Sequence, residues 1–196
     1  MRPKVVLYLA AGFLTALLLT SGAWAQTKNL EAIATLKFYA AAQGNSFAVG
    51  TSPGNVIFDG SSIWVANGPS CSLTKLRASD GTSLGTFPTG HGPRKIAFDG
   101  SSVWVANAFS TNVTKLRASD GLNQGTFSVT HSPVTLAFDG VCVWVTNIAD
   151  NTVTRLCFTD GLNMGTFPTG RGPIGIAFDG ANLWITNTVD STVSKL

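Results

Sequence analysis

One pattern returns every 40 residues through most of this chain and limits what the chain can fold into. The tripeptide Phe-Asp-Gly occurs four times at this spacing, each time with a Trp six residues after the Phe and an Asn three residues further on. These residues are Trp64, Trp104, Trp144 and Trp184, and Asn67, Asn107, Asn147 and Asn187. A fixed period of this length indicates a repeat architecture, in which each unit buries its apolar surface against its neighbours.

Within one period, short apolar runs alternate with turn residues, which is typical of strands. Asp99-Gly100 and Asp120-Gly121 are tight-turn signals between such runs. The expected strands of this period cover residues 95–98, 103–106, 113–116 and 126–129. In the chain after the N-terminal leader described below, a helical pattern is found only over residues 30–42. Four strands per 40 residues predict an all-β propeller built from about four four-stranded blades.

The repeat phases do not divide evenly into blades. They cover residues 51–90, 91–130, 131–170 and 171–196, and residues 30–50 match the second half of a period. Two interpretations follow. Residues 45–49 could supply the missing outer strand of the last blade, or the chain could be a partial propeller, truncated or completed by a second copy. Unpaired sheet edges favour association, so a homo-oligomer is one expectation.

The N-terminus has the pattern of a secretory leader. Arg2 and Lys4 precede an apolar run, and Ala23-Trp24-Ala25 has the form of a cleavage site. We therefore expect a signal peptide over residues 1–25, a repeat domain over 26–196, and a periplasmic or secreted protein without membrane attachment after cleavage. The alternative is an uncleaved anchor.

The charge balance argues against a nucleic acid as partner. The whole chain has 13 basic and 10 acidic residues, and removing the leader lowers the formal net charge from +3 to +1. That is too little positive charge for a nucleic-acid-binding surface.

The repeat resembles a known family. The pattern G-x-G-P-x-x-I-A-F-D-G-x-x-x-W-V-x-N is present from Gly90 to Asn107, and a closely similar sequence runs from Gly170 to Asn187. It resembles the YVTN-type repeats and is similar to the streptogramin (virginiamycin B) lyase-like β-propellers. The resemblance covers about residues 30–196 and implies a propeller fold. For lyase members it also implies elimination of a cyclic ester by His and Glu residues with Mg²⁺.

The residues that break the repeat are the candidates for a site. In an antiparallel meander, the second-to-third loops and the blade-to-blade connections lie on one rim. Basic residues that vary between repeats fall on this rim: His91, Arg94, Lys95, His131 and Arg171. They predict binding of a small anionic ligand or an acidic protein surface. The alternative is a solvated set of loops without a ligand.

On the opposite rim, an Asp-Gly turn is expected at each connection between the first and second strands and between the third and fourth strands of a repeat. The residues are Asp59, Asp80, Asp99, Asp120, Asp139, Asp160 and Asp179. We expect these carboxylates to cap turns, with a calcium site as the alternative.

Two of the three cysteines predict a cross-strand contact. If the loop at 148–151 is a tight hairpin, Cys142 and Cys157 face each other. A disulfide between them is then one interpretation in an exported protein, and two separate thiols are the other.

A binding module is favoured over an enzyme. A lyase or lactonase-like hydrolase would need a base, for which His91 and His131 are the candidates, and a metal to stabilise the enolate. The only Glu is Glu31, and on the variable rim only Asp150 and Asp190 could help to hold Mg²⁺. We therefore expect no metal or other cofactor unless the lyase alternative holds. A third possibility is a fragment whose active residues lie in further blades.

Overall fold

The computed structural model describes residues 9–10, 13–14 and 45–196, in two units, Met1–Ser46 and Phe47–Leu196. In the first unit, β1 (Leu9–Ala10) pairs antiparallel with β2 (Phe13–Leu14). The rest of the predicted leader and the helical pattern at 30–42 lie outside the described residues. In the described part of the chain, no helix is long and apolar enough to cross a membrane.

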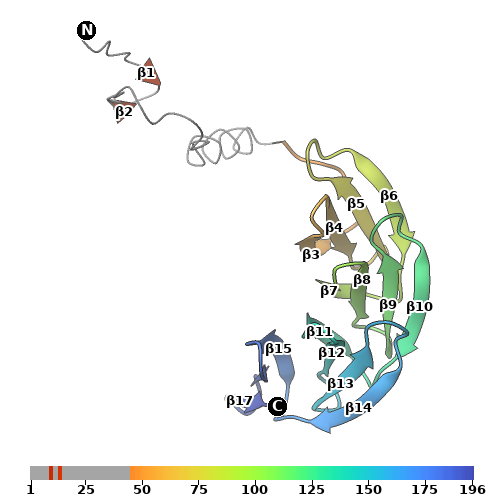
Figure 1. The fold of residues 1–196 in the computed structure, drawn as a ribbon, viewed down its shortest axis with the longest axis vertical. Coiled ribbons are helices and arrows are strands. Elements are labelled where there is room, and N and C mark those ends of the chain that lie inside the picture. The colour runs from red at the N-terminus through yellow and green to blue at the C-terminus, as the bar shows by residue number, and fades with distance from the viewer. Residues whose placement is uncertain (1–8, 11–12, 15–44) are drawn as a thin grey trace, which may run out of the picture. The chain divides into compact units, whose positions relative to one another are not determined.

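The second unit contains four antiparallel sheets in which consecutive strands pair (Figure 1). The first sheet has β3 (Pro53–Phe58), β4 (Ser62–Asn67), β5 (Ser72–Arg77) and β6 (Ser83–Pro88). The second has β7 (Pro93–Phe98), β8 (Ser102–Asn107), β9 (Asn112–Arg117) and β10 (Asn123–Ser128). The third has β11 (Pro133–Phe138), β12 (Cys142–Asn147), β13 (Thr152–Cys157) and β14 (Asn163–Pro168). The fourth has β15 (Pro173–Phe178), β16 (Leu183–Asn187) and β17 (Thr192–Lys195).

These sheets confirm the predicted all-β repeat of about four blades. The first strands of successive blades lie side by side, β3 next to β7, β7 next to β11 and β11 next to β15. The four strands expected within residues 93–130 are all present, each slightly longer than its apolar core.

The apolar core lies between blades, because each strand presents alternate residues to the blade before it and the blade after it. Trp64 of the first blade is fully buried and packs with Val103, Val105 and Leu116 of the second. Trp104 packs in the same way against the third blade. The repeated Trp is therefore a wedge between sheets, as the 40-residue period predicts.

A Phe on the fourth strand completes each wedge. Phe87 lies 5.5 Å from Trp64, centroid to centroid, and its ring also covers Gly121 in an Asp-Gly turn of the next blade. A Cβ on Gly121, whose φ is +79°, would lie 2.1 Å from a Phe87 ring atom. The Gly of this turn is therefore required both for its backbone conformation and for the close approach of the neighbouring ring.

The Asp of the first turn has a second role that the sequence did not reveal. Asp99 Oδ1 accepts hydrogen bonds from the amides of Ser101 and Ser102, which confirms the predicted cap. Its Oδ2 accepts a 2.7 Å hydrogen bond from Trp104 Nε1. The same indole bond forms in the other three blades, from Trp64, Trp144 and Trp184. The turn therefore fixes the orientation of the wedge.

A buried lysine adds a polar link between blades. Lys115 Nζ lies over the Trp104 ring and donates to the carbonyl oxygens of Phe158 and Thr159 in the third blade, at 2.6 and 3.0 Å. Lys75 makes the equivalent bonds from the first blade to the second. These bonds satisfy a charge that is almost fully removed from water.

The last blade has three strands, and residues 45–49 form none. The interpretation in which this segment supplies the missing outer strand of the last blade is therefore wrong for this structure. Phe47 covers Gly81 of the first blade, as Phe87 covers Gly121. It thus stands where the outer-strand Phe of a preceding blade would stand, which agrees with the match between residues 30–50 and the second half of a period.

The contribution of the Lys115 hydrogen bonds to stability can be measured by comparison with Arg155, which makes no bond to a carbonyl of the next blade. Lys115→Met should lower the free energy of unfolding by about 1–3 kcal/mol, because two carbonyls lose their donor. Arg155→Met is the control, since Arg155 also stacks over a Trp but donates to Cys142 Sγ rather than to a carbonyl. Urea unfolding measures both variants, and equal losses would contradict the role of the carbonyl bonds.

The turn carboxylates predict a pH dependence of stability. Partial burial tends to raise the pKa of Asp139, but hydrogen bonds from Trp144, Cys142 and Val141 outweigh it and lower the pKa below the ordinary 3.8. A lowered pKa stabilises the folded state above pH 3.8, and this contribution is lost as the pH falls through the folded-state pKa. Asp139→Asn should therefore destabilise at pH 7, and the difference from wild type in thermal unfolding should shrink as the pH falls below 3.8. A difference independent of pH would contradict this.

Candidate functional site

The variable rim is organised by a hydrogen bond that recurs in each blade. The backbone amide of one loop residue donates to a side-chain oxygen 19 residues later, in the loop between the second and third strands. The pairs are Thr51 with Ser70, His91 with Ser110, His131 with Asp150, and Arg171 with Asp190. The acceptor is thus a hydroxyl in the first two blades and a carboxylate in the last two.

The carboxylate in the third blade also binds the histidine side chain. His131 Nδ1 lies 3.0 Å from Asp150 Oδ2. The backbone amide of His131, more than its side chain, lowers the pKa of Asp150 below the ordinary value. This histidine therefore has an acidic partner already.

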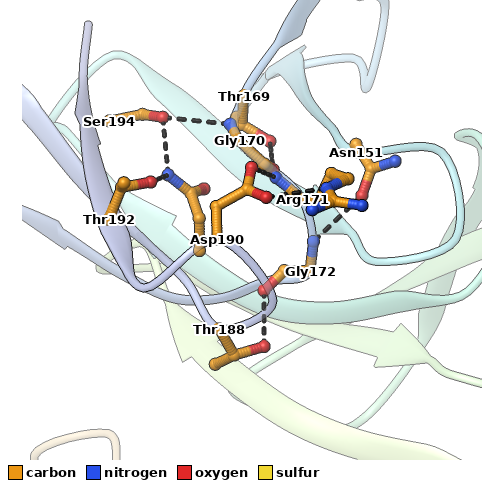
Figure 2. Close-up of polar contacts among 10 residues, drawn as sticks. Asn151, Thr169, Gly170, Arg171, Gly172, Thr188, Asp190, Thr192 and Ser194 are labelled. Carbon is orange, nitrogen blue, oxygen red and sulfur yellow. Dashed lines mark hydrogen bonds and ion pairs between the residues drawn. The ribbon is translucent and has the colours of Figure 1, made fainter.

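Arg171 is paired in the same way, as Figure 2 shows. Its Nε donates to Asp190 Oδ1 at 2.7 Å, and its backbone amide donates to Asp190 Oδ2 at 2.6 Å. The backbone bond, followed by the guanidinium, lowers the pKa of Asp190. The positive charge of Arg171 is thus locally balanced.

His91 and Arg94 have a different environment. No carboxylate lies within ion-pair distance of either among the described residues. For His91 the reason is that Ser110 holds the place of Asp150 and Asp190. Both line a cavity of about 430 Å³ between the first two blades. The remaining lining residues are Ser52, Gly54, Gly68, Pro69, Cys71, Gly92, Pro93, Ala108 and Phe109.

The walls of this cavity are largely apolar. Pro69, Pro93 and Ala108 form part of the lining, and the ring of Phe109 is 82% exposed at the rim. A Cβ at Gly92, whose φ is +64°, would lie 2.4 Å from an atom of the Phe109 ring. The ring can therefore pack here only because residue 92 is a glycine. The cavity therefore combines two basic side chains with an apolar wall, which suits a ligand with an acidic group and an apolar body.

The structure divides the five predicted rim residues into three groups. His91 and Arg94 share the cavity, while Lys95 follows Arg94 on β7 and is not part of its lining. His131 and Arg171 lie in later blades, each paired with an aspartate. Of the five basic residues predicted for this rim, only His91 and Arg94 thus share a cavity.

Sequence reasoning assigned no role to Cys71, which lines the cavity with a φ of +48°. Its equivalents Asn151 and Ser191 have the same backbone conformation, so the loop and not the thiol sets this geometry. Phe109 could be found as a repeat-breaking residue, since the other repeats place Pro69, Ala149 and Val189 there.

Cys142 and Cys157 face each other in the strand register, as predicted, and both are free thiols in this structure. Cys142 Sγ accepts a 3.0 Å hydrogen bond from Arg155 Nε and lies 3.9 Å from Met164 Sδ. Cys157 Sγ lies 3.0 Å from Thr159 Oγ1. Each sulfur is turned toward a polar or soft neighbour, so opposite backbone positions do not bring the two sulfurs together.

The two carboxylates predicted as magnesium ligands on the rim are engaged by basic residues of the protein. Mg²⁺ needs oxygen ligands in near-octahedral geometry, usually including carboxylates. In the described ranges, no three His, Cys, Asp or Glu side chains are grouped so that they could hold a metal. Asp150 and Asp190, the carboxylates predicted as candidates, are bound to His131 and Arg171 instead.

Solved structures of other proteins share this arrangement of sheets, whereas no protein-family model and no curated protein matches the sequence. Hydrazine synthase of Kuenenia stuttgartiensis is 20% identical with a TM-score of 0.64, covering 74% of this chain and 45% of that one. Streptogramin B lyase is 19% identical with a TM-score of 0.58, covering 72% and 53%. BamB from Moraxella catarrhalis is 13% identical with a TM-score of 0.62, covering 72% and 42%.

These likenesses concern the fold. The chain spans about half the length of these three proteins. The four consecutive antiparallel sheets, the wedge between them and these neighbours together define the class: the chain is a β-propeller repeat protein.

Proposed function

We propose that this protein is an exported binding module that holds a small anionic ligand with an apolar body in the cavity between its first two blades. The observation that carries the proposal is the contrast between blades. The basic residues of the third and fourth blades are paired with Asp150 and Asp190, whereas His91 and Arg94 line a cavity with a serine in the place of the aspartate.

Each part of the cavity has a role in this binding. The Arg94 guanidinium would form a two-pronged hydrogen bond with a carboxylate or sulfonate, and His91 would add a second donor. Phe109 and the two prolines would cover the apolar body of the ligand. Export rests on the leader pattern at residues 1–25, which would place the module where it meets extracellular or periplasmic solutes.

Matched ligands and variants test the anion site. We expect 2-naphthoate to bind more tightly than neutral 2-naphthamide, and Arg94→Gln to weaken naphthoate binding by about tenfold, as loss of a charge-assisted hydrogen bond predicts. Arg171→Gln is the control, because that arginine already has an acidic partner. Isothermal titration measures both affinities. Equal affinity for acid and amide, or equal effects of the two substitutions, would reject the site.

Alkylation of Cys71 locates the bound ligand independently. Saturating naphthoate should slow the reaction of Cys71 with iodoacetamide, because this residue lines the cavity. Cys157, which is also partly exposed but lies outside the cavity, should react at an unchanged rate. Protection of neither residue would place the ligand elsewhere.

A lyase of the streptogramin B type is the second candidate, favoured by one observation. Asp150 holds Nδ1 of His131, an arrangement that can orient a histidine as a general base. Opening of a streptogramin B lactone in the presence of Mg²⁺, followed by mass spectrometry, tests it. We expect no turnover, because Asp150 and Asp190, the carboxylates that could help to hold Mg²⁺, are already paired with His131 and Arg171. Turnover abolished by His131→Ala would establish the lyase instead.

A further inference from the structure

The two end blades each expose a surface that is buried everywhere else in the repeat. On the last blade this surface carries Trp184, which is 41% exposed, whereas Trp64 and Trp104 are completely buried. Lys195 lies over the Trp184 ring, as Lys115 lies over Trp104. We refer to the face of the last blade that carries Trp184, Val193 and Lys195 as the trailing face.

The first blade exposes the face that, in the second and third blades, packs beneath the preceding blade. Val56 is 58% exposed, although its equivalents Ile96 and Leu136 are both 7% exposed beneath the preceding blade. Ala78 is also exposed, whereas Ala118 is buried. We refer to the face of the first blade that carries Val56, Ile63 and Ala78 as the leading face.

The repeat itself shows how these faces fit together. Between the first and second blades, and again between the second and third, the trailing face packs on the leading face, with the Trp against the apolar residues of the next blade. Lys75 and Lys115 donate to two consecutive carbonyls of the next blade. The carbonyls at the equivalent position on the leading face are those of Ala78 and Ser79. Lys195, the equivalent of Lys75 and Lys115, has no carbonyl acceptor among the described residues.

The Trp–Phe contact found in the first three blades is incomplete at both ends of the repeat. In the first three blades the Trp packs on a fourth-strand Phe, at 5.5 to 5.7 Å between ring centroids. Trp184 has no such Phe among the described residues, since its blade ends at the third strand. Phe47, 47% exposed, already covers Gly81 as a fourth-strand Phe should, but no Trp packs on it in the described part of the chain.

The two faces do not meet within one chain. The first strands of neighbouring blades pack in the order β3, β7, β11 and β15. The series does not close on itself, because β15 does not pack on β3 in the same way. Among the described residues, the trailing face and the leading face are thus both without the neighbour that each such face has between the inner blades.

We propose that the trailing face of one copy packs on the leading face of a second copy, with Phe47 of the second copy on Trp184 of the first. Two copies joined in this way at both ends would form one closed ring of eight blades, within the four to eight blades that propellers commonly have. A head-to-tail contact that closes after two copies leaves no face exposed.

Mass measurements of the purified chain test the assembly. Native mass spectrometry and light scattering should find twice the mass of one chain at micromolar concentration. Trp184→Ala and Phe47→Ala should each raise the dissociation constant of the dimer by roughly a hundredfold or more, as loss of a central aromatic contact does. Phe109→Ala is the matched control, because this exposed aromatic lies on neither face and its loss should leave the dimer unchanged. Far-UV circular dichroism confirms that each variant is folded.

Mixing the two variants separates the proposed pairing from other contacts. A heterodimer of Trp184→Ala with Phe47→Ala keeps one complete Phe47–Trp184 pair, whereas either homodimer keeps none. Native mass spectrometry should therefore find the heterodimer in clear excess over both homodimers. A monomeric wild-type chain, an open polymer, or a statistical mixture of variants would each overturn the proposal.

Discussion

The fold depends on one tryptophan in each blade that is held by its own turn and buried by the next blade. The carboxylate of Asp99 fixes the Trp104 indole at 2.7 Å, and the ring then fills the space before the third blade. A sheet of four short strands cannot bury both of its faces alone, so this wedge couples the stability of each blade to that of its neighbours. The same dependence explains why Trp184, on which no blade packs among the described residues, is exposed.

The regularity of the wedge also indicates where function can arise. Residues that serve packing must recur, so the informative positions are those that change while the backbone stays the same. The loop bond across 19 residues keeps its geometry in all four blades, yet its acceptor changes from Ser110 to Asp190. This change decides whether the basic side chain at the donor position has a carboxylate partner within the protein, as His131 and Arg171 do, or a hydroxyl, as His91 does.

The positions of the strands and their register could be predicted from the sequence, whereas the directions of individual side chains could not. Alternation and turn signals determine which residues oppose each other, so the facing positions of Cys142 and Cys157 could be predicted. Whether the sulfurs meet depends on neighbours in other strands, here Arg155 and Met164, which no local pattern specifies. For the same reason the basic rim was predicted as a set, while its division by Asp150 and Asp190 required the 19-residue pairing to be seen in space.

The candidate cavity and the proposed contact between copies use different parts of the same repeat. The cavity is completed by Cys71 of the first blade and Phe109 of the second, so one chain contains all of its lining residues. Trp184 and Val56 lie on the outer faces of the end blades and take no part in it. Assembly of two copies would therefore duplicate the ligand site on one rim rather than create it. The proposed binding to a single chain and the proposed closure of the ring would thus be physically separable.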